Sequence, residues 1–117
     1  MRRVLLLAGP HILLAGALVL LAGPSTAVVR VPGDAPRVSS ALLIVEPHDT
    51  ILVAPGVYVD TIVWPSKTGI KLLSEAGFQA TILDGGGRDQ VIGIYCSVDT
   101  TTVVRGFTIR NGHAEGM

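Results

Sequence analysis

The sequence predicts an all-β protein built as a parallel β-solenoid of about three rungs, and three observations carry this prediction. Short apolar runs rich in β-branched residues recur between Val31 and Gly112. Residues that favour turns, mostly Gly, Pro and Asp, separate these runs. Hydrophobic residues make up 49% of the chain but aromatic residues only 4%, which suits a narrow core of small side chains.

Two interleaved sets of apolar runs define the expected strand columns. The runs of each set begin 19 to 21 residues apart, at Ile51, Ile70 and Val91 for the first set and at Ile62, Ile82 and Val103 for the second. Strands spaced so evenly would stack in register in at least two parallel sheets. An antiparallel sandwich with hairpins also has short strands and turns, but it needs no fixed period, so we prefer the solenoid.

The expected corners lie between the apolar runs, where the backbone needs a positive or a locked φ. They are Ala54-Pro55-Gly56, Pro65-Ser66, Glu75-Ala76-Gly77, Asp84-Gly85-Gly86-Gly87 and Asn111-Gly112. Gly106 marks a further corner. The runs on its two sides, 103–104 and 107–109, belong either to adjoining sheets of one rung or to two rungs.

The first 27 residues are expected to be a signal peptide. Arg2 and Arg3 precede an apolar stretch from Val4 to Ala22, and Ser25-Thr26-Ala27 offers small residues for cleavage after Ala27. An uncleaved anchor is the alternative, because 19 apolar residues could just cross a bilayer. Cleavage would leave a domain of residues 28–117 in the periplasm, outside the cell or on its surface.

Several segments in order resemble the amino-terminal turns of exported bacterial right-handed parallel β-helix proteins of the pectate-lyase-like superfamily. These segments are Val31-Pro32-Gly33-Asp34, residues 49–58, residues 71–77, residues 81–86 and residues 106–112. The resemblance implies the fold of the whole mature chain. It says little about function, because such turns occur in lyases, glycoside hydrolases, esterases and adhesins alike.

The two ends of the coil are expected to differ, and the resemblance implies a cap at the first end. A short cap helix is expected over Arg37 to Val45, begun by Ser39 or Ser40 and stopped by Pro47. No such cap follows Asn111-Gly112, so the last rung is expected to be uncovered and to favour self-association. On this interpretation the chain is the amino-terminal portion of a longer β-helix protein.

Charge argues against two classes of partner. The whole chain has nine basic and nine acidic residues, and the remainder after loss of Arg2 and Arg3 has a formal charge of −2. The basic residues are scattered singly, so neither nucleic acid nor, after signal cleavage, a membrane surface is expected as a partner. The lone Cys96 can form no disulfide within the chain and is expected to be a buried, inert thiol.

Few residues are candidates for chemistry. Trp64 and Tyr58 could stack on a sugar ring, although packing is the preferred role for Trp64. Asp84, Asp89 and Asp99 lie in turns or loops, and a Ca²⁺ site among them is only a guess, so no cofactor is expected. His48 and His113 are expected on surface loops, and Gly85-Gly86-Gly87 lacks the partners of a phosphate loop.

The sequence therefore leaves two functions open, and a truncated product without function as a third possibility. The preferred one is an exported β-helix module for polysaccharide binding or cell-surface display, with no complete active site in this chain. The alternative is the amino-terminal part of a polysaccharide lyase or glycoside hydrolase whose catalytic rungs lie beyond residue 117. Whether this chain is an enzyme stays undecided at this point.

Overall fold

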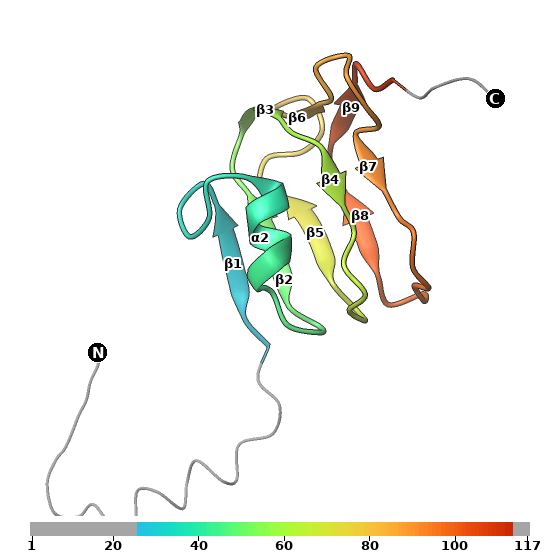
Figure 1. Cartoon of the computed structure of the whole chain (residues 1–117). Coiled ribbons are helices and arrows are strands. Elements are labelled where there is room, and N and C mark those ends of the chain that lie inside the picture. The colour runs from blue at the N-terminus through green and yellow to red at the C-terminus, as the bar shows by residue number, and fades with distance from the viewer. Residues whose placement is uncertain (1–25, 114–117) are drawn as a thin grey trace, which may run out of the picture.

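Parallel strand pairs organise the whole of the described chain, which in this computed structural model covers residues 26–113. Their three sheets wind into a β-solenoid of about three turns, and the rungs follow one another from β1 to β8 (Figure 1). Pairing of every strand with a parallel neighbour rules out the hairpin sandwich. The predicted signal peptide lies outside the described residues, except for Thr26 and Ala27.

Each sheet takes strands that are far apart in the sequence. The four-stranded sheet has the order β1 (Val28–Val31), β2 (Thr50–Val53), β5 (Lys71–Ser74) and β8 (Val103–Arg105). The three-stranded sheet has the order β3 (Gly56–Val59), β6 (Thr81–Asp84) and β9 (Thr108–Arg110). The two-stranded sheet joins β4 (Ile62–Val63) to β7 (Ile92–Gly93). Because β8 and β9 belong to different sheets, Gly106 is the corner between adjoining sheets of one rung.

The predicted strand columns are wrong in register. Ile51 pairs with Leu72 rather than Ile70, and Leu72 pairs with Val104. Ile62 pairs with Ile92, while Ile82 lies between Val57 and Thr108. The reason is that the rungs differ in length: Thr50 pairs with Lys71, 21 positions on, but Lys71 pairs with Val103, 32 positions on. The longer connections also contain buried apolar residues, Ile70 and Val91, which imitate strand starts.

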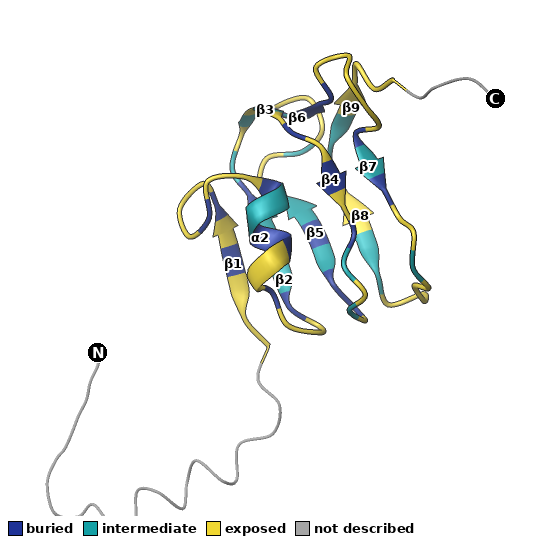
Figure 2. Ribbon diagram, in the orientation of Figure 1, coloured by how far each residue is buried: buried dark blue, intermediate teal, exposed yellow. Residues whose placement is uncertain are grey.

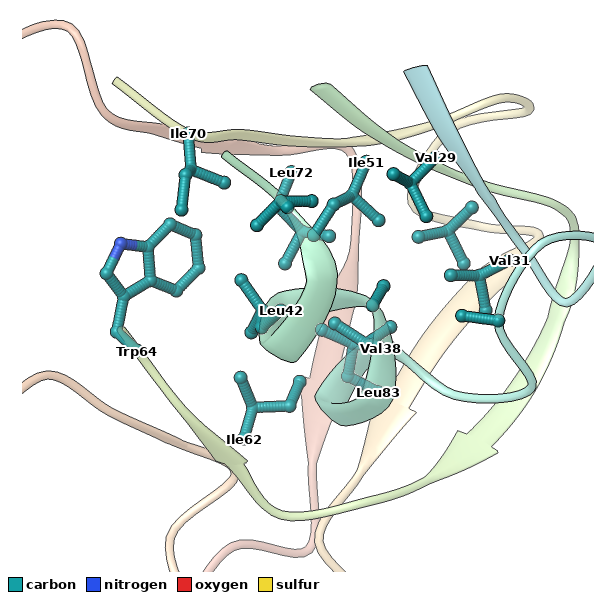
Figure 3. Packing of buried hydrophobic residues seen from close by; sticks show 14 of the residues in the cluster. Val29, Val31, Val38, Leu42, Ile51, Ile62, Trp64, Ile70, Leu72 and Leu83 are labelled. Carbon is teal, nitrogen blue, oxygen red and sulfur yellow. The ribbon is translucent and has the colours of Figure 1, made fainter. Parts of the chain in front are cut away.

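The core lies inside the coil, where alternate residues of the strands point. Figure 2 shows buried residues recurring on β1, β2 and β5, and exposed residues taking their place on β8. The side chains in the first column are Val29, Ile51 and Leu72, and those in a second are Val31 and Val53. Figure 3 shows Trp64 and Ile70 on one side of this core, with Leu42 among the strand residues.

The predicted cap helix is present as α2 (Val38–Ile44). Its Val38, Ala41 and Leu42 are buried in the core at the β1 end of the solenoid. The start differs in detail from the prediction. Ser40 Oγ accepts a hydrogen bond from the Arg37 N–H and donates one to the Arg37 carbonyl, while the Ser39 N–H is bound by a carboxylate from another rung.

Candidate functional site

The outward face of the four-stranded sheet gathers three cations and two leucines. Alternation along each strand places Ile51, Val53 and Leu72 in the core, so their neighbours point away from it. The register aligns Arg30, Leu52, Leu73 and Arg105 in one row across the sheet. Lys71 lies on the same outward face, beside Thr50 and Val103. We call Arg30, Leu52, Lys71, Leu73 and Arg105 the basic sheet face.

The three cations of the basic sheet face differ in their interaction partners. Arg30 Nη1 forms a 3.2 Å ion pair with Glu75 Oε2, a carboxylate just beyond β5. Lys71 Nζ donates to the Gly69 carbonyl at 3.3 Å and forms no ion pair with any residue that the structure describes. Arg105 is exposed and forms no ion pair within residues 26–113. Two of the three cations are therefore available to an anionic ligand.

The geometry of the face suits an extended ligand. Adjacent strands lie about 4.8 Å apart, so the row from Arg30 to Arg105 spans about 14 Å. Guanidinium groups bind carboxylates through two parallel hydrogen bonds, and the intervening leucines offer apolar contact. A ligand that alternates apolar ring faces with carboxylates would match this pattern.

Sequence reasoning missed this face because each cation stands alone in its own segment. The sequence did contain a signal for this face. Lys71 and Arg105 each lie next to apolar residues in a strand, as outward-facing cations of a strand would. The row becomes visible only when the register is known. If the assumed strand register were wrong by a few residues, Leu73 would no longer pair with Arg105.

The two aromatic residues proposed for sugar stacking differ in how far they are buried. Trp64 is 3% exposed and belongs to the core, so it offers no open ring face to a sugar (Figure 3). Its Nε1 has no hydrogen-bond partner among residues 26–113. Tyr58 is half-buried on β3, and its hydroxyl donates to the Ala54 carbonyl at 2.8 Å. Burial, as the larger cause, and the negative charge of Glu75 raise the pKa of Tyr58. A contact between Tyr58 and a sugar stays a prediction.

Two buried carboxylates serve the backbone. Asp60, in the connection after β3, accepts the Ser39 N–H at 2.8 Å and the Thr61 N–H at 2.9 Å. It thereby fastens the first turn of α2 to the next rung. Asp49 similarly accepts the N–H groups of Ala27 and Glu46, both at 2.8 Å. Both carboxylates therefore hold separate backbone segments together.

Asp84 has the turn role that its glycine-rich surroundings predicted. Its Oδ1 accepts the Gly86 N–H at 2.8 Å, and its Oδ2 accepts Arg110 Nε at 2.9 Å and Asn111 Nδ2 at 3.0 Å. The Gly86 hydrogen bond, then that from Arg110, holds the pKa of Asp84 below its ordinary value. This carboxylate joins the corner after β6 to the end of β9.

Asparagine at position 84 should make the protein less sensitive to acid. Since the folded-state pKa of Asp84 is lowered, its stabilising contribution is complete above about pH 4, the ordinary value, and is lost as the pH falls through the folded-state pKa. Melting temperatures from pH 7 to pH 2.5 should therefore fall less steeply in Asp84→Asn than in the unmodified protein. Asp89→Asn is the control, because the exposed Asp89 side chain accepts the N–H of the next residue, Gln90. Parallel curves for all three proteins would contradict this expectation.

The other candidate residues do not form a common site. Asp99 accepts hydrogen bonds from the hydroxyl and N–H of Thr101, and these, the hydroxyl first, lower its pKa. His48 and His113 are exposed, as expected. Cys96 is half-buried rather than buried as expected, with its Sγ near the carbonyls of Trp64 and Pro65. Within residues 26–113, no three His, Cys, Asp or Glu side chains lie close enough together to hold a metal ion.

A groove of about 360 Å³ lies between α2 and β4. It combines one cation, three hydroxyl groups and apolar walls, from Pro36, Arg37, Ser39, Ser40, Leu43, Thr61 and Val63. This groove has a single cation and adjoins the short strand β4, so it offers fewer charged contacts to an acidic polymer than the basic sheet face does.

Comparison with known proteins found no match to this chain among protein-family models, curated proteins or solved structures. Among the residues that the structure describes, α2 has only seven residues, and no helix has the length and hydropathy needed to cross a membrane.

Proposed function

We propose that this chain is an exported β-solenoid module that binds an acidic polysaccharide through the basic sheet face. The observation that carries the proposal is the aligned row Arg30, Leu52, Leu73 and Arg105, with Lys71 beside it on the same outward face. Export is inferred from the predicted signal peptide. The ligand class is proposed from the charges and leucines of the basic sheet face, because the resemblance to pectate-lyase-like proteins implies the fold and not the ligand. Display on a cell surface is compatible with the same binding role.

Binding is proposed rather than cleavage because of what the carboxylates do. Asp49, Asp60 and Asp84 are the buried acids of the described chain, and each accepts hydrogen bonds through both of its oxygens. A general acid or base needs an oxygen within reach of the substrate. The cations of the basic sheet face can hold and orient carboxylates, which is sufficient for binding.

The salt dependence of binding follows from the exposure of these cations. Interactions between exposed charges are screened over about 8 Å at physiological ionic strength. The module should therefore hold polygalacturonate or alginate at low salt and release most of it at high salt. A neutral glycan such as dextran should be held weakly under both conditions, since only the leucines and backbone would contact it.

Affinity measurements on the exported protein test the proposal. Arg105→Gln should weaken polygalacturonate binding roughly three- to tenfold, as expected when one solvent-exposed, screened contact worth about 1 kcal/mol is lost. Arg88→Gln removes the same charge from an exposed corner away from the sheet, so it should leave the affinity unchanged.

Two results would overturn the proposal. One is equal weakening by Arg105→Gln and Arg88→Gln, which would indicate non-specific charge attraction. The other is the absence of binding to every acidic glycan at low salt. If incubation instead released unsaturated sugar products, the polysaccharide-lyase alternative would replace the binding module.

A further inference from the structure

The basic sheet face is not uniform in charge. Lys71 on β5 and Arg105 on β8 lie on this face, and neither forms an ion pair within residues 26–113. Asp99, an acid that precedes β8 in the sequence, accepts the hydroxyl and the N–H of Thr101 in the loop before that strand. The half of the face formed by β5 and β8 therefore presents two positive charges to a ligand.

The half formed by β1 and β2 has the opposite charge. Glu75 Oε2 lies 3.2 Å from Arg30 Nη1 and neutralises its charge. The exposed Asp34 accepts the Arg30 N–H through its Oδ2 at 2.8 Å, so a second carboxylate lies beside the same residue. One cation with two carboxylates gives this half a formal charge of −1.

The ion pair between Arg30 and Glu75 lies in the path of a ligand on this face. Because β2 lies between β1 and β5, the two side chains meet across β2 (Figure 1). The Glu75 N–H bonds to the Val53 carbonyl, which places Glu75 at the end of β2. The side chains are 58% exposed for Arg30 and 38% for Glu75, so a ligand can contact both.

This division of charge matters because of the spacing of the strands. One sugar residue of a glycan is about as long as the distance between neighbouring strands, about 4.8 Å. A glycan along the row from Arg30 to Arg105 would therefore place about one residue over each strand. A carboxylate over β8 would meet Arg105 and Lys71, whereas a carboxylate over β1 or β2 would meet Glu75 and Asp34. Like charges placed together lower the affinity, and uncharged sugars over β1 and β2 avoid that cost.

We propose that Glu75, together with Asp34, selects acidic glycans in which uncharged residues separate the uronates. This inference rests on the proposed function, because it assigns the spacing of charge along the ligand of the same face. A uronate lies over β8, near Arg105 and Lys71, and uncharged residues lie over β2 and β1. Hydroxyl groups of these residues can donate to the Glu75 carboxylate and accept from the Arg30 guanidinium.

Two tetrasaccharides of equal length test the proposed charge spacing. One is tetragalacturonate, which has a carboxylate on every residue, and the other is a galactose tetramer with a single terminal galacturonate. In titrations followed by nuclear magnetic resonance at low salt, the single-uronate tetramer should bind at least as tightly as tetragalacturonate. Attraction by net charge alone would give the opposite order, because it increases with the number of carboxylates.

Substitution of Glu75 should reverse the order of the two affinities. Glu75→Gln removes a like charge and frees Arg30, so the affinity for tetragalacturonate should rise roughly three- to tenfold and that for the single-uronate tetramer less than about twofold. Arg30→Gln leaves Glu75 unpaired and should lower only the affinity for tetragalacturonate. The control is Asp89→Asn, which removes a negative charge from the connection between β6 and β7, outside this sheet, and should leave both affinities unchanged.

The results distinguish failure of this inference from failure of the proposed function. If no acidic glycan binds, or if Arg105→Gln and Arg88→Gln weaken binding equally, the proposed function fails and this inference fails with it. If binding depends on Arg105 but tetragalacturonate binds more tightly than the single-uronate tetramer, only the inference about Glu75 is overturned. Equal effects of Glu75→Gln and Asp89→Asn would likewise overturn the role of Glu75 alone.

Discussion

The substitution Gly106→Ala should lower the free energy of unfolding by about 2–4 kcal/mol. About 1–2 kcal/mol of this comes from placing an alanine at a positive φ, and a similar amount comes from overpacking. Gly106 has a φ of +90° at the corner between β8 and β9. A Cβ there would lie 2.3 Å from Ser74 Oγ, in the rung before it. Ser74 cannot move freely, because its Oγ accepts the Gly77 N–H at 3.0 Å.

Gly77 is a matched control for this substitution. Its φ is +89°, almost that of Gly106, but a Cβ at Gly77 would meet nothing within 4 Å. Gly77→Ala should therefore incur only the backbone penalty. The difference between the two variants, measured by chemical denaturation, isolates the stacking of the corner on Ser74.

Removing the obstructing hydroxyl should reduce the cost. In a Ser74→Ala background, the effect of Gly106→Ala on the free energy of unfolding should approach that of Gly77→Ala. Equal effects of Gly106→Ala and Gly77→Ala in the unmodified protein would show that the corner does not stack on Ser74, and the register of β5 with β8 would then be wrong.

Truncation of Leu72 to alanine should cost about 2–5 kcal/mol, the range for buried leucines that leave a cavity. Leu72 lies on the middle strand of its column, fully buried between Ile51 and Val104. Strands on both sides limit how far the cavity can close. Because small domains are stable by only about 5–15 kcal/mol, this variant should melt at a markedly lower temperature.

Leu43→Ala is the control for Leu72→Ala. Leu43 is on the outer surface of α2, where it is largely exposed, so its loss should change stability by no more than about 0.5 kcal/mol. Urea denaturation of both variants measures the difference. A cost below 1 kcal/mol for Leu72→Ala would place this side chain outside the core and contradict the solenoid register.

Much of the fold could be predicted because local signals and global architecture agree. Positive φ angles occur at Gly77, Gly86 and Gly106, all at expected corners, and α2 begins and ends within the predicted range. The parallel arrangement followed from the recurring apolar runs. These features depend on the backbone preferences of single residues and short segments, which the sequence displays directly.

The register could not be predicted, because it depends on loop lengths that the sequence does not mark. Ile70 and Val91 are as apolar as strand residues, yet they precede β5 and β7. The basic sheet face depends on that register and was missed with it. Asp60 was missed for a related reason: its partner, the Ser39 N–H, lies 21 positions away and shows no pattern in the sequence.

Nuclear magnetic resonance mapping of a bound glycan tests most directly the central claim, that the stacked strands build a binding face. Titrating the exported protein with short polygalacturonate oligomers should shift the amide signals of Arg30, Leu52, Lys71, Leu73 and Arg105 in a saturable way, and leave those of the groove beside α2 unchanged. Saturable shifts confined to that groove, or no saturable shifts at all, would contradict the claim.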